Sequence, residues 1–352
     1  MAHSEARLIA NGRMLAQLRK EWGPRMFSWV PLDFWHRLMG FELLMPFYHL
    51  IGDGEVPHVS GLYRFRNIQQ FKSDLNFFLK SYTPVSLGDV IAHLEGKTPL
   101  PRRSFLLSFD DGFHEIHDIV APILLSQGIP AVFFLTTAVI DNLVLGSEAK
   151  KSLLICAGSR LESSTAKREL LRRLDNAGIA GSDLASGIRN IRYNQKSLLD
   201  EIAAILECDF DGYLRSVNPY VTSAQTRALL DQGFAIGAHG VDHPLYSQLS
   251  LEEQLRQTIE SVEWLSNRFQ YRCEAFAFPH NDAGVQVEFF EQAFARAGLK
   301  VSFGTAAISR HFYPKNLERF TMDVTHLETQ EILSREFAVS LLRGHCRALV
   351  RN

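Results

Sequence analysis

The chain has little cysteine and almost no excess charge. Its four cysteines lie far apart and show no paired ligand spacing: Cys156, Cys208, Cys273 and Cys346. We therefore interpret them as unbridged packing residues in a reducing compartment. The formal net charge is −2 and basic residues form no long run. Nothing in the sequence therefore indicates binding to a nucleic acid.

Long apolar runs are also absent. No segment reaches the roughly 18 apolar residues of a membrane span, and residues 1–7 lack the basic start of a secretory signal. We therefore expect a cytoplasmic protein without a membrane span. Residues 27–51 are nevertheless rich in aromatic side chains, and three tryptophans lie in or near this region: Trp22, Trp29 and Trp35. They indicate either a peripheral membrane contact or, as we expect, a segment packed on the main domain.

Two adjacent carboxylates end one apolar segment. Residues 104–109 read Ser-Phe-Leu-Leu-Ser-Phe, which is typical of a buried strand, and Asp110, Asp111 and Gly112 follow directly. Gly112 permits a sharp turn, so both acids are predicted at the C-terminal end of the strand, where α/β enzymes commonly hold their reactive groups. Two neighbouring anions require a metal ion or a proton to neutralise one of them. A turn that only closes the strand would explain the same residues.

A pair of histidines follows a second apolar segment. Residues 237–244 read Gly-Ala-His-Gly-Val-Asp-His-Pro, after the apolar residues 233–236. His239 and His243 are four residues apart, a spacing found among metal ligands. Pro244 disfavours a helical conformation at His243, so we predict the pair on a loop that leaves a strand. Two incidental surface histidines would explain this motif alone, but together with the paired aspartates it predicts a metal site.

Strand and helix patterns alternate along most of the chain. Helical spacing of apolar residues covers 67–80, 115–127, 251–269 and 286–297, and apolar strand segments include 131–135 and 299–303. This order predicts an α/β fold with parallel strands and crossover helices, which one barrel can accommodate. Residues 141–219 break the pattern, because they show helical spacing, many basic residues and no strand. We predict a helical insertion there.

The insertion has two interpretations. It could be a lid or a docking surface, with six arginines available for a phosphate or an acidic sugar: Arg160, Arg168, Arg172, Arg173, Arg189 and Arg192. A solvated helical face with alternating charges would explain the same residues, and we favour it.

The two motifs together resemble the polysaccharide deacetylase superfamily, carbohydrate esterase family 4. The resemblance extends to residues 128–135, Gly-Ile-Pro-Ala-Val-Phe-Phe-Leu, and to residues 276–279, Phe-Ala-Phe-Pro. Upstream, residues 46–49, Pro-Phe-Tyr-His, resemble the Tyr-His opening of the permuted bacterial branch that acts on exopolysaccharides. The segments that match cover residues 43–140 and 219–325. The resemblance implies an irregular (β/α)7-type barrel over 43–352, with the helical insertion at 141–219 inside it and an N-terminal helical and aromatic extension at 1–42.

The resemblance also implies a role for each motif. Asp111, His239 and His243 would bind a divalent metal, for which we expect Zn²⁺, with Co²⁺, Ni²⁺ or Mn²⁺ as alternatives. Asp110 would take a proton from the metal's water, and His49 would protonate the departing amine. A hydrogen-bonded core histidine would also explain His49.

Several departures from the family's pattern bear on the substrate. Gly240 stands where the family usually has Ser or Thr, so a side-chain hydrogen bond that would steady the loop is missing. The aromatic-Pro segment continues as His280-Asn281-Asp282 in place of an aromatic residue and Gly. The residues that we expect to contact substrate are Phe278, Pro279, His280, Asn281 and Arg319. His280 is also a rival for the acid, and Arg319 is a substitute for the arginine that steadies the family's base.

The predicted reaction is the metal-dependent removal of an N-acyl group, expected to be acetyl, from an amino sugar. Amide hydrolysis needs a strong nucleophile, stabilisation of the oxyanion and a proton for the leaving amine. Because we expect a cytoplasmic protein, we predict a small, nucleotide-linked or lipid-linked amino sugar as substrate. A deformylase or cyclic-amide hydrolase is an alternative on the same site. A degenerate sugar-binding module is another, against which the intact Asp110, Asp111, His239 and His243 argue.

Overall fold

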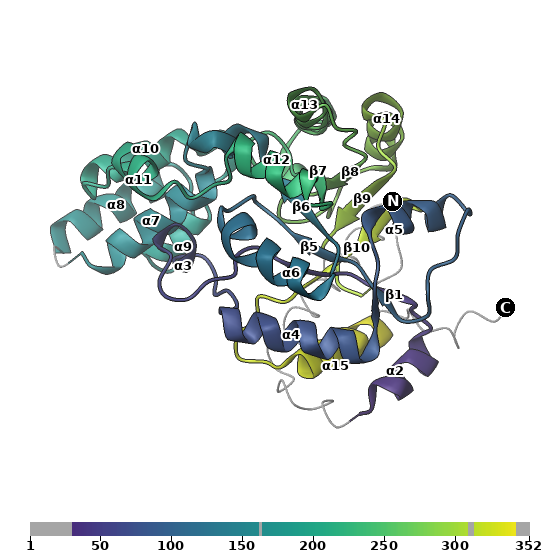
Figure 1. The fold of residues 1–352 in the computed structure, drawn as a ribbon. Helices are drawn as coiled ribbons and strands as arrows, with labels where there is room; N and C mark the ends of the chain where they lie inside the picture. The colour runs from purple at the N-terminus through teal and green to yellow at the C-terminus, as the bar shows by residue number, and fades with distance from the viewer. Residues whose placement is uncertain (1–29, 162–163, 309–312, 343–352) are drawn as a thin grey trace.

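The computed structural model describes residues 30–161, 164–308 and 313–342, and its centre is one curved parallel sheet (Figure 1). The order of the strands is β10-β9-β8-β7-β6-β5-β2-β11. Their bounds are β2 Pro46–Tyr48, β5 Leu107–Phe109, β6 Ala131–Leu135, β7 Ala235–Ala238, β8 Ala275–Ala277, β9 Val301–Gly304, β10 Asn316–Glu318 and β11 Phe320–Thr321. Every pairing in this sheet is parallel, as the alternation of strands and helices predicts.

One chain segment closes the sheet into a barrel. Strand β10 pairs with β9 at one edge of the sheet, and β11 pairs with β2 at the other. Only Arg319 separates β10 from β11, so the two strands are one segment that joins both edges. Seven chain segments therefore form the barrel, which confirms the predicted (β/α)7-type fold.

A small parallel sheet extends the barrel at the opposite end from the strand C-termini. It has the order β1-β4-β3, with β1 Leu43–Leu44, β3 Thr83–Pro84 and β4 Ser104–Phe105. Strands β1 and β4 each run on into a barrel strand after one residue, at Met45 and Leu106. The apolar segment before the paired aspartates therefore contributes to both sheets.

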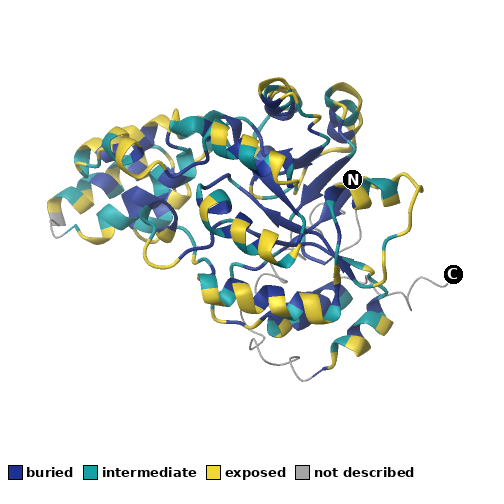
Figure 2. Ribbon diagram, in the orientation of Figure 1, coloured by how far each residue is buried: buried dark blue, intermediate teal, exposed yellow. Residues whose placement is uncertain are grey.

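Helices cover the outside of the barrel. They are α4 Ile68–Ser81, α5 Leu87–Leu94, α6 Ala121–Gln127, α12 Ser223–Asp231, α13 Leu251–Phe269, α14 Val287–Ala297 and α15 Thr329–Leu342. The short helix α3 Pro57–Ser60 packs instead against the helix at residues 147–159. The predicted helices at 67–80, 251–269 and 286–297 agree with α4, α13 and α14. The predicted helix at 115–127 begins with a π-helical turn, Ile116–Val120, before α6. Figure 2 shows the strands as almost continuously buried, which explains their apolar composition.

The described part of the segment between β6 and α12 consists of helices joined by turns and loops and contains no named strand. After a 3-10 turn, Thr137–Asn142, it forms α7 Ser147–Ser159, α8 Ser164–Asn176, α9 Leu184–Arg189, a 3-10 turn Tyr193–Gln195, α10 Ser197–Ile205 and α11 Phe210–Val217. These helices gather at one side of the barrel (Figure 1) around a separate apolar cluster that includes Leu154, Leu170 and Leu199. Arg172 and Arg173 both pair with Glu169, as on a solvated face with alternating charges.

The described part of the N-terminal extension packs on the barrel's C-terminal helix. Helix α2 Leu32–Met39 carries Trp35, which is 3% exposed. Its ring stacks on Phe337 of α15 at 6.0 Å between centroids. Trp22, Trp29 and Cys346 lie outside the described residues. Among the described helices, none combines the length and apolar character needed to cross a bilayer.

Candidate active site

The register of the parallel strands brings the sequence motifs to one edge of the barrel. Phe47 of β2 pairs with Ser108 of β5, so the residues that follow, His49 and Asp110, leave the sheet side by side. Leu135 of β6 pairs with Ala238 of β7, so His239 leaves the sheet beside the end of β6. Parallel strands therefore deliver the tyrosine-histidine, aspartate and histidine motifs to the same end, where α/β barrels place their active sites.

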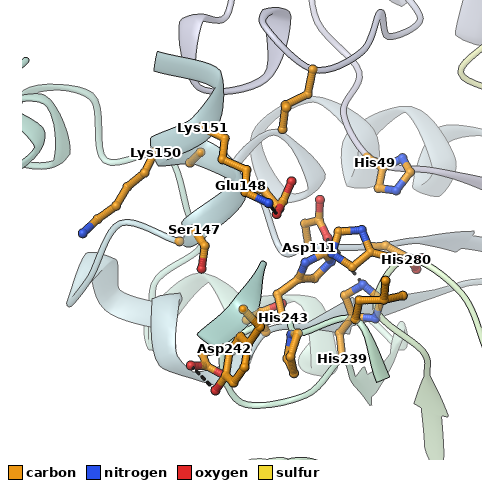
Figure 3. Close-up of a pocket in the computed structure, with 18 of the residues that line it drawn as sticks. His49, Asp111, Ser147, Glu148, Lys150, Lys151, His239, Asp242, His243 and His280 are labelled. Carbon is orange, nitrogen blue, oxygen red and sulfur yellow. Dashed lines mark hydrogen bonds and ion pairs between the residues drawn. The ribbon is translucent and has the colours of Figure 1, made fainter. Parts of the chain in front are cut away.

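Asp111, His239 and His243 form a compact set of candidate metal ligands (Figure 3). Asp111 Oδ1 lies 3.4 Å from His239 Nε2 and 3.1 Å from His243 Nε2. One ligand atom from each residue lies within 4.8 Å of the others. His239 Nδ1 lies 2.8 Å from the carbonyl oxygen of Ala277, and because a carbonyl only accepts, Nδ1 carries the proton. The lone pair of Nε2 then faces Asp111, as a metal ligand requires.

These three side chains fit a divalent metal. Asp111 Oδ1 is buried and accepts no hydrogen bond within the described residues, although a buried carboxylate oxygen normally has a partner. Two imidazole nitrogens and one carboxylate oxygen are a donor set typical of catalytic zinc and related ions. Asp111 and His243 also have positive φ angles, 72° and 63°. Such strained backbone persists where the surrounding structure imposes it, as at active sites.

Arg319 holds the second aspartate, Asp110. Nη1 and Nη2 of Arg319 donate to the two carboxylate oxygens of Asp110 at 2.6 and 2.7 Å, and both side chains are almost fully buried. The guanidinium lies over the rings of Phe47 and Phe134, 4.5 and 5.1 Å from their centroids. Burial alone would raise the pKa of Asp110, but the charge of Arg319 lowers it below the usual value. Asp110 is therefore ionised at neutral pH.

His49 pairs with an acid that the sequence analysis did not identify, Asp323. Nδ1 of His49 lies 2.6 Å from Oδ2 of Asp323. Burial alone would lower the pKa of His49, but the hydrogen bond and charge of Asp323 raise it to about 9. Asp323 follows β11, which is parallel to β2, so it reaches the same edge of the barrel. An acid just after a short apolar segment, Phe320-Thr321-Met322, is the signal that could have identified it.

Only some residues of the aromatic-Pro segment and of the residues that follow it line the pocket. Phe278 and His280 line the pocket, and the His280 ring lies 4.6 Å from that of His243. Pro279, Asn281 and Arg319 are not among the described pocket-lining residues. The side chain of Asn281 accepts a hydrogen bond from the backbone of Ala283 within a turn. Arg319 contacts the candidate base instead of the pocket. Burial lowers the pKa of His280 to about 4, and the nearby His243 contributes to this shift, so His280 is neutral.

The pocket above the candidate metal ligands has a volume of about 1590 Å³ and two walls. The barrel supplies one wall, and the helical insertion supplies the other through residues that include Ser147, Glu148, Lys150 and Lys151 (Figure 3). Glu148 and Lys151 pair at 2.8 Å in the first turns of α7. Tyr63, on the barrel side, has a buried hydroxyl without a hydrogen-bond partner in the described residues. No motif in the sequence marks Glu148 or Tyr63.

Comparison with protein families gives one match. A family model described as polysaccharide deacetylase matches residues 208–301. The matched part contains His239, His243 and the aromatic-Pro segment, whereas Asp110 and Asp111 precede it. This match confirms the resemblance that the motifs indicated. No curated protein matches the chain.

Solved deacetylase structures share the fold. Streptococcus pyogenes deacetylase PplD in complex with acetate has a TM-score of 0.55 and 15% identity, over 84% of this chain and 98% of that one. IcaB from Ammonifex degensii has a TM-score of 0.52 and 14% identity, over 84% and 97%. The de-N-acetylase from Aggregatibacter actinomycetemcomitans has a TM-score of 0.50 and 16% identity, over 82% and 97%. At such identities the likeness shows the fold.

Proposed function

We propose that this deacetylase-like chain is a metal-dependent hydrolase that removes an N-acetyl group from an amino sugar. One observation carries the proposal: three candidate metal ligands lie beside an aspartate that Arg319 keeps ionised, at the edge of the barrel where the strands end. A divalent ion held by Asp111, His239 and His243 would polarise the acyl oxygen and lower the pKa of a water. Zn²⁺ is our first choice for this ion, with Co²⁺, Ni²⁺ or Mn²⁺ as alternatives.

The two remaining catalytic roles are those of the general base, which we assign to Asp110, and of the general acid, which we assign to His49. Each oxygen of Asp110 accepts one hydrogen bond from Arg319, which leaves a lone pair free to accept a proton from the attacking water. His49 donates through Nδ1 to Asp323, so its Nε2 proton is the one available to the leaving amine. The pKa of about 9 keeps His49 protonated at neutral pH, as a general acid must be.

The pocket supports a substrate larger than a single sugar. Its volume of about 1590 Å³ exceeds the roughly 300–1,000 Å³ of ordinary small-molecule pockets. Glu148 and Lys151 line this space and are partly exposed, so sugar hydroxyls can bind them. Of the expected substrates, we propose a nucleotide-linked or lipid-linked amino sugar, with the carrier lying along the wall formed by the insertion.

Mass spectrometry tests the proposed reaction. The metal-loaded protein is incubated with N-acetylated sugars, their nucleotide-linked and lipid-linked forms, and N-formyl analogues. We expect the loss of an acetyl mass and the appearance of free acetate from at least one amino sugar. Selective loss of formyl would favour the deformylase alternative. If a fully metal-loaded protein turns over no N-acyl sugar, the proposed function is wrong.

His49→Ala should impair amide hydrolysis more than ester hydrolysis. An amine leaving group needs a proton, whereas an alcohol leaves more easily, so loss of the true donor harms the acetamide more than the matching acetyl ester. Steady-state rates on such a substrate pair measure the selectivity. His280→Ala is the matched control, and we expect from it a smaller and unselective effect. An amide-selective defect in His280→Ala alone would transfer the role to His280.

Asp323→Asn should move the alkaline limb of the pH–rate profile to lower pH. The folded-state pKa of His49 is raised to about 9 from about 6.5. His49 is therefore fully protonated in the folded protein below its usual pKa, and it loses its proton only as pH rises through the raised folded-state pKa. Asn removes the charge that raises this pKa, while burial still lowers it. The pH profile of kcat is measured for the wild-type protein and for Asp323→Asn, each loaded with the same metal. An unchanged alkaline limb would contradict the role of Asp323.

A further inference from the structure

Residues that lie outside the loop between the two histidine ligands, His239 and His243, hold this loop in place. Gly240 has φ +77°, a backbone conformation that strains side-chain-bearing residues. A Ser or Thr at this position, as the family usually has, would therefore be strained. Another residue has to support the backbone that leads to His243, whose own φ is also positive.

Gln257 of α13 supplies part of this support. Its Oε1 accepts hydrogen bonds from the backbone N–H groups of Val241 and Asp242 at 2.9 and 3.3 Å. Its Nε2 donates to Oδ1 of Asp242 at 2.7 Å, and the whole side chain is buried. On the other side of the loop, Thr137 and Ala138 donate their N–H groups to the carbonyls of Gly240 and Val241.

The helical insertion supplies the rest. Tyr193 donates its hydroxyl proton to the carboxylate of Asp242, whose two oxygens lie 3.0 and 2.9 Å away. Lys196 Nζ lies 2.8 Å from Oδ2 of the same carboxylate. The Tyr193 backbone N–H also donates to Gln248, five residues after His243. Asp242 lies at the edge of the pocket, next to the metal ligand (Figure 3).

We propose that Tyr193, Lys196 and Gln257 form an anchor around Asp242 that positions His243 as a metal ligand. The inference rests on the proposed metal site. Asp242 and His243 are adjacent, so a carboxylate fixed by three donors also fixes the backbone that aims the imidazole toward Asp111. The insertion thereby sets the affinity for the metal, in addition to forming one wall of the pocket. Tyr193 and Lys196 are positioning residues in this view, because neither contacts the metal.

Metal titration of the chain of 352 residues tests the anchor. The protein is stripped with a chelator, and Zn²⁺ or Co²⁺ is titrated in competition with a chromophoric chelator. We expect Tyr193→Phe/Lys196→Met to raise the metal Kd by ~10–100-fold, the range for losing partners that orient metal ligands. Lys196→Met alone should give a smaller increase. Lys196→Arg should restore an affinity near that of the wild type, because it keeps a cation on Asp242.

Two controls separate positioning from general stability. Tyr213→Phe removes another tyrosine hydroxyl from the insertion, one that bonds His58 at 2.8 Å, and should leave the metal Kd unchanged. The metal-free double variant should unfold near the wild-type temperature, because partly exposed pairs contribute little to global stability. The side chains of Lys196 and Asp242 are 51% and 27% exposed.

The possible failures can be told apart. If the wild-type protein binds metal and the double variant binds it equally tightly, the anchor is wrong and the proposed function stands. If Tyr213→Phe weakens metal binding as much as the double variant does, the effect is a general one of the insertion and the anchor is again wrong. If the wild-type protein binds neither ion, the proposed metal site is overturned and the anchor with it.

Discussion

Asp110→Asn should keep the metal and lose turnover by ~10²–10⁴-fold, the range for a lost general acid or base. Asn has nearly the shape of Asp but cannot accept the water's proton. The same change leaves the buried guanidinium of Arg319 without its counter-charge, and breaking a buried pair in this way costs about 3–5 kcal/mol. We therefore expect a lower unfolding temperature as well. Elemental analysis, turnover and thermal unfolding of one preparation measure all three effects.

A double variant separates the loss of the base from the loss of stability. Asp110→Asn/Arg319→Met removes both charges and leaves an apolar side chain among Phe47, Phe134 and Phe303. Replacing a buried pair by apolar groups is often neutral for stability, so the double variant should unfold at a higher temperature than Asp110→Asn and remain inactive. Turnover near the wild-type rate in metal-loaded Asp110→Asn would remove Asp110 from the mechanism.

His239→Ala and Asp111→Asn should each lose the metal and, with it, nearly all activity. Each removes a proposed ligand, so the loss in affinity should exceed the ~10–100-fold typical of outer-shell partners. Asn suits position 111 because it tolerates the positive φ there better than most residues. The fold should be retained, since the barrel closes through strand pairing and not through these side chains.

The matched control for the histidine is His117→Ala. His117 pairs with Asp118 at 2.7 Å on a partly exposed helical surface and should leave metal content and turnover unchanged. Elemental analysis after gel filtration measures the metal content of each variant. A full equivalent of metal in both His239→Ala and Asp111→Asn would show that the site is assigned to the wrong residues.

Features that depend on neighbouring residues could be predicted from the sequence. The apolar run before Asp110 and the proline after His243 are local signals, and the structure has a strand end and a loop at these places. Helices α4 and α13 could also be predicted, because their capping residues and apolar spacing lie within one segment. The convergence of the motifs follows from parallel pairing, which the alternation of strands and helices indicates.

Features that depend on distant pairing could not be predicted in this way. Asp323 lies 274 residues from His49, which it contacts, and an isolated acid carries no sign of its partner. Gln257 accepts hydrogen bonds from the backbone of Val241 and Asp242, just after Gly240, but in the sequence it is an ordinary polar residue within a helix. The insertion's contribution to the pocket, through Glu148, depends on how α7 docks, which periodicity alone does not determine.

The position of Arg319 links the closure of the barrel to the ion pair of the proposed base, Asp110. Arg319 lies between the two strands that join the sheet edges, and its partner Asp110 is 209 residues earlier in the chain. During synthesis the N-terminal part of a chain is available first, so β2, β5 and the candidate metal ligands all precede the residue that balances the charge of Asp110. The contact between Arg319 and Asp110 spans 209 residues, and contacts between residues far apart in the sequence form slowly. The proposed base Asp110 therefore gains its counter-charge only where β10 and β11 join the two edges of the sheet, and a chain without this closure would lack the Arg319–Asp110 pair.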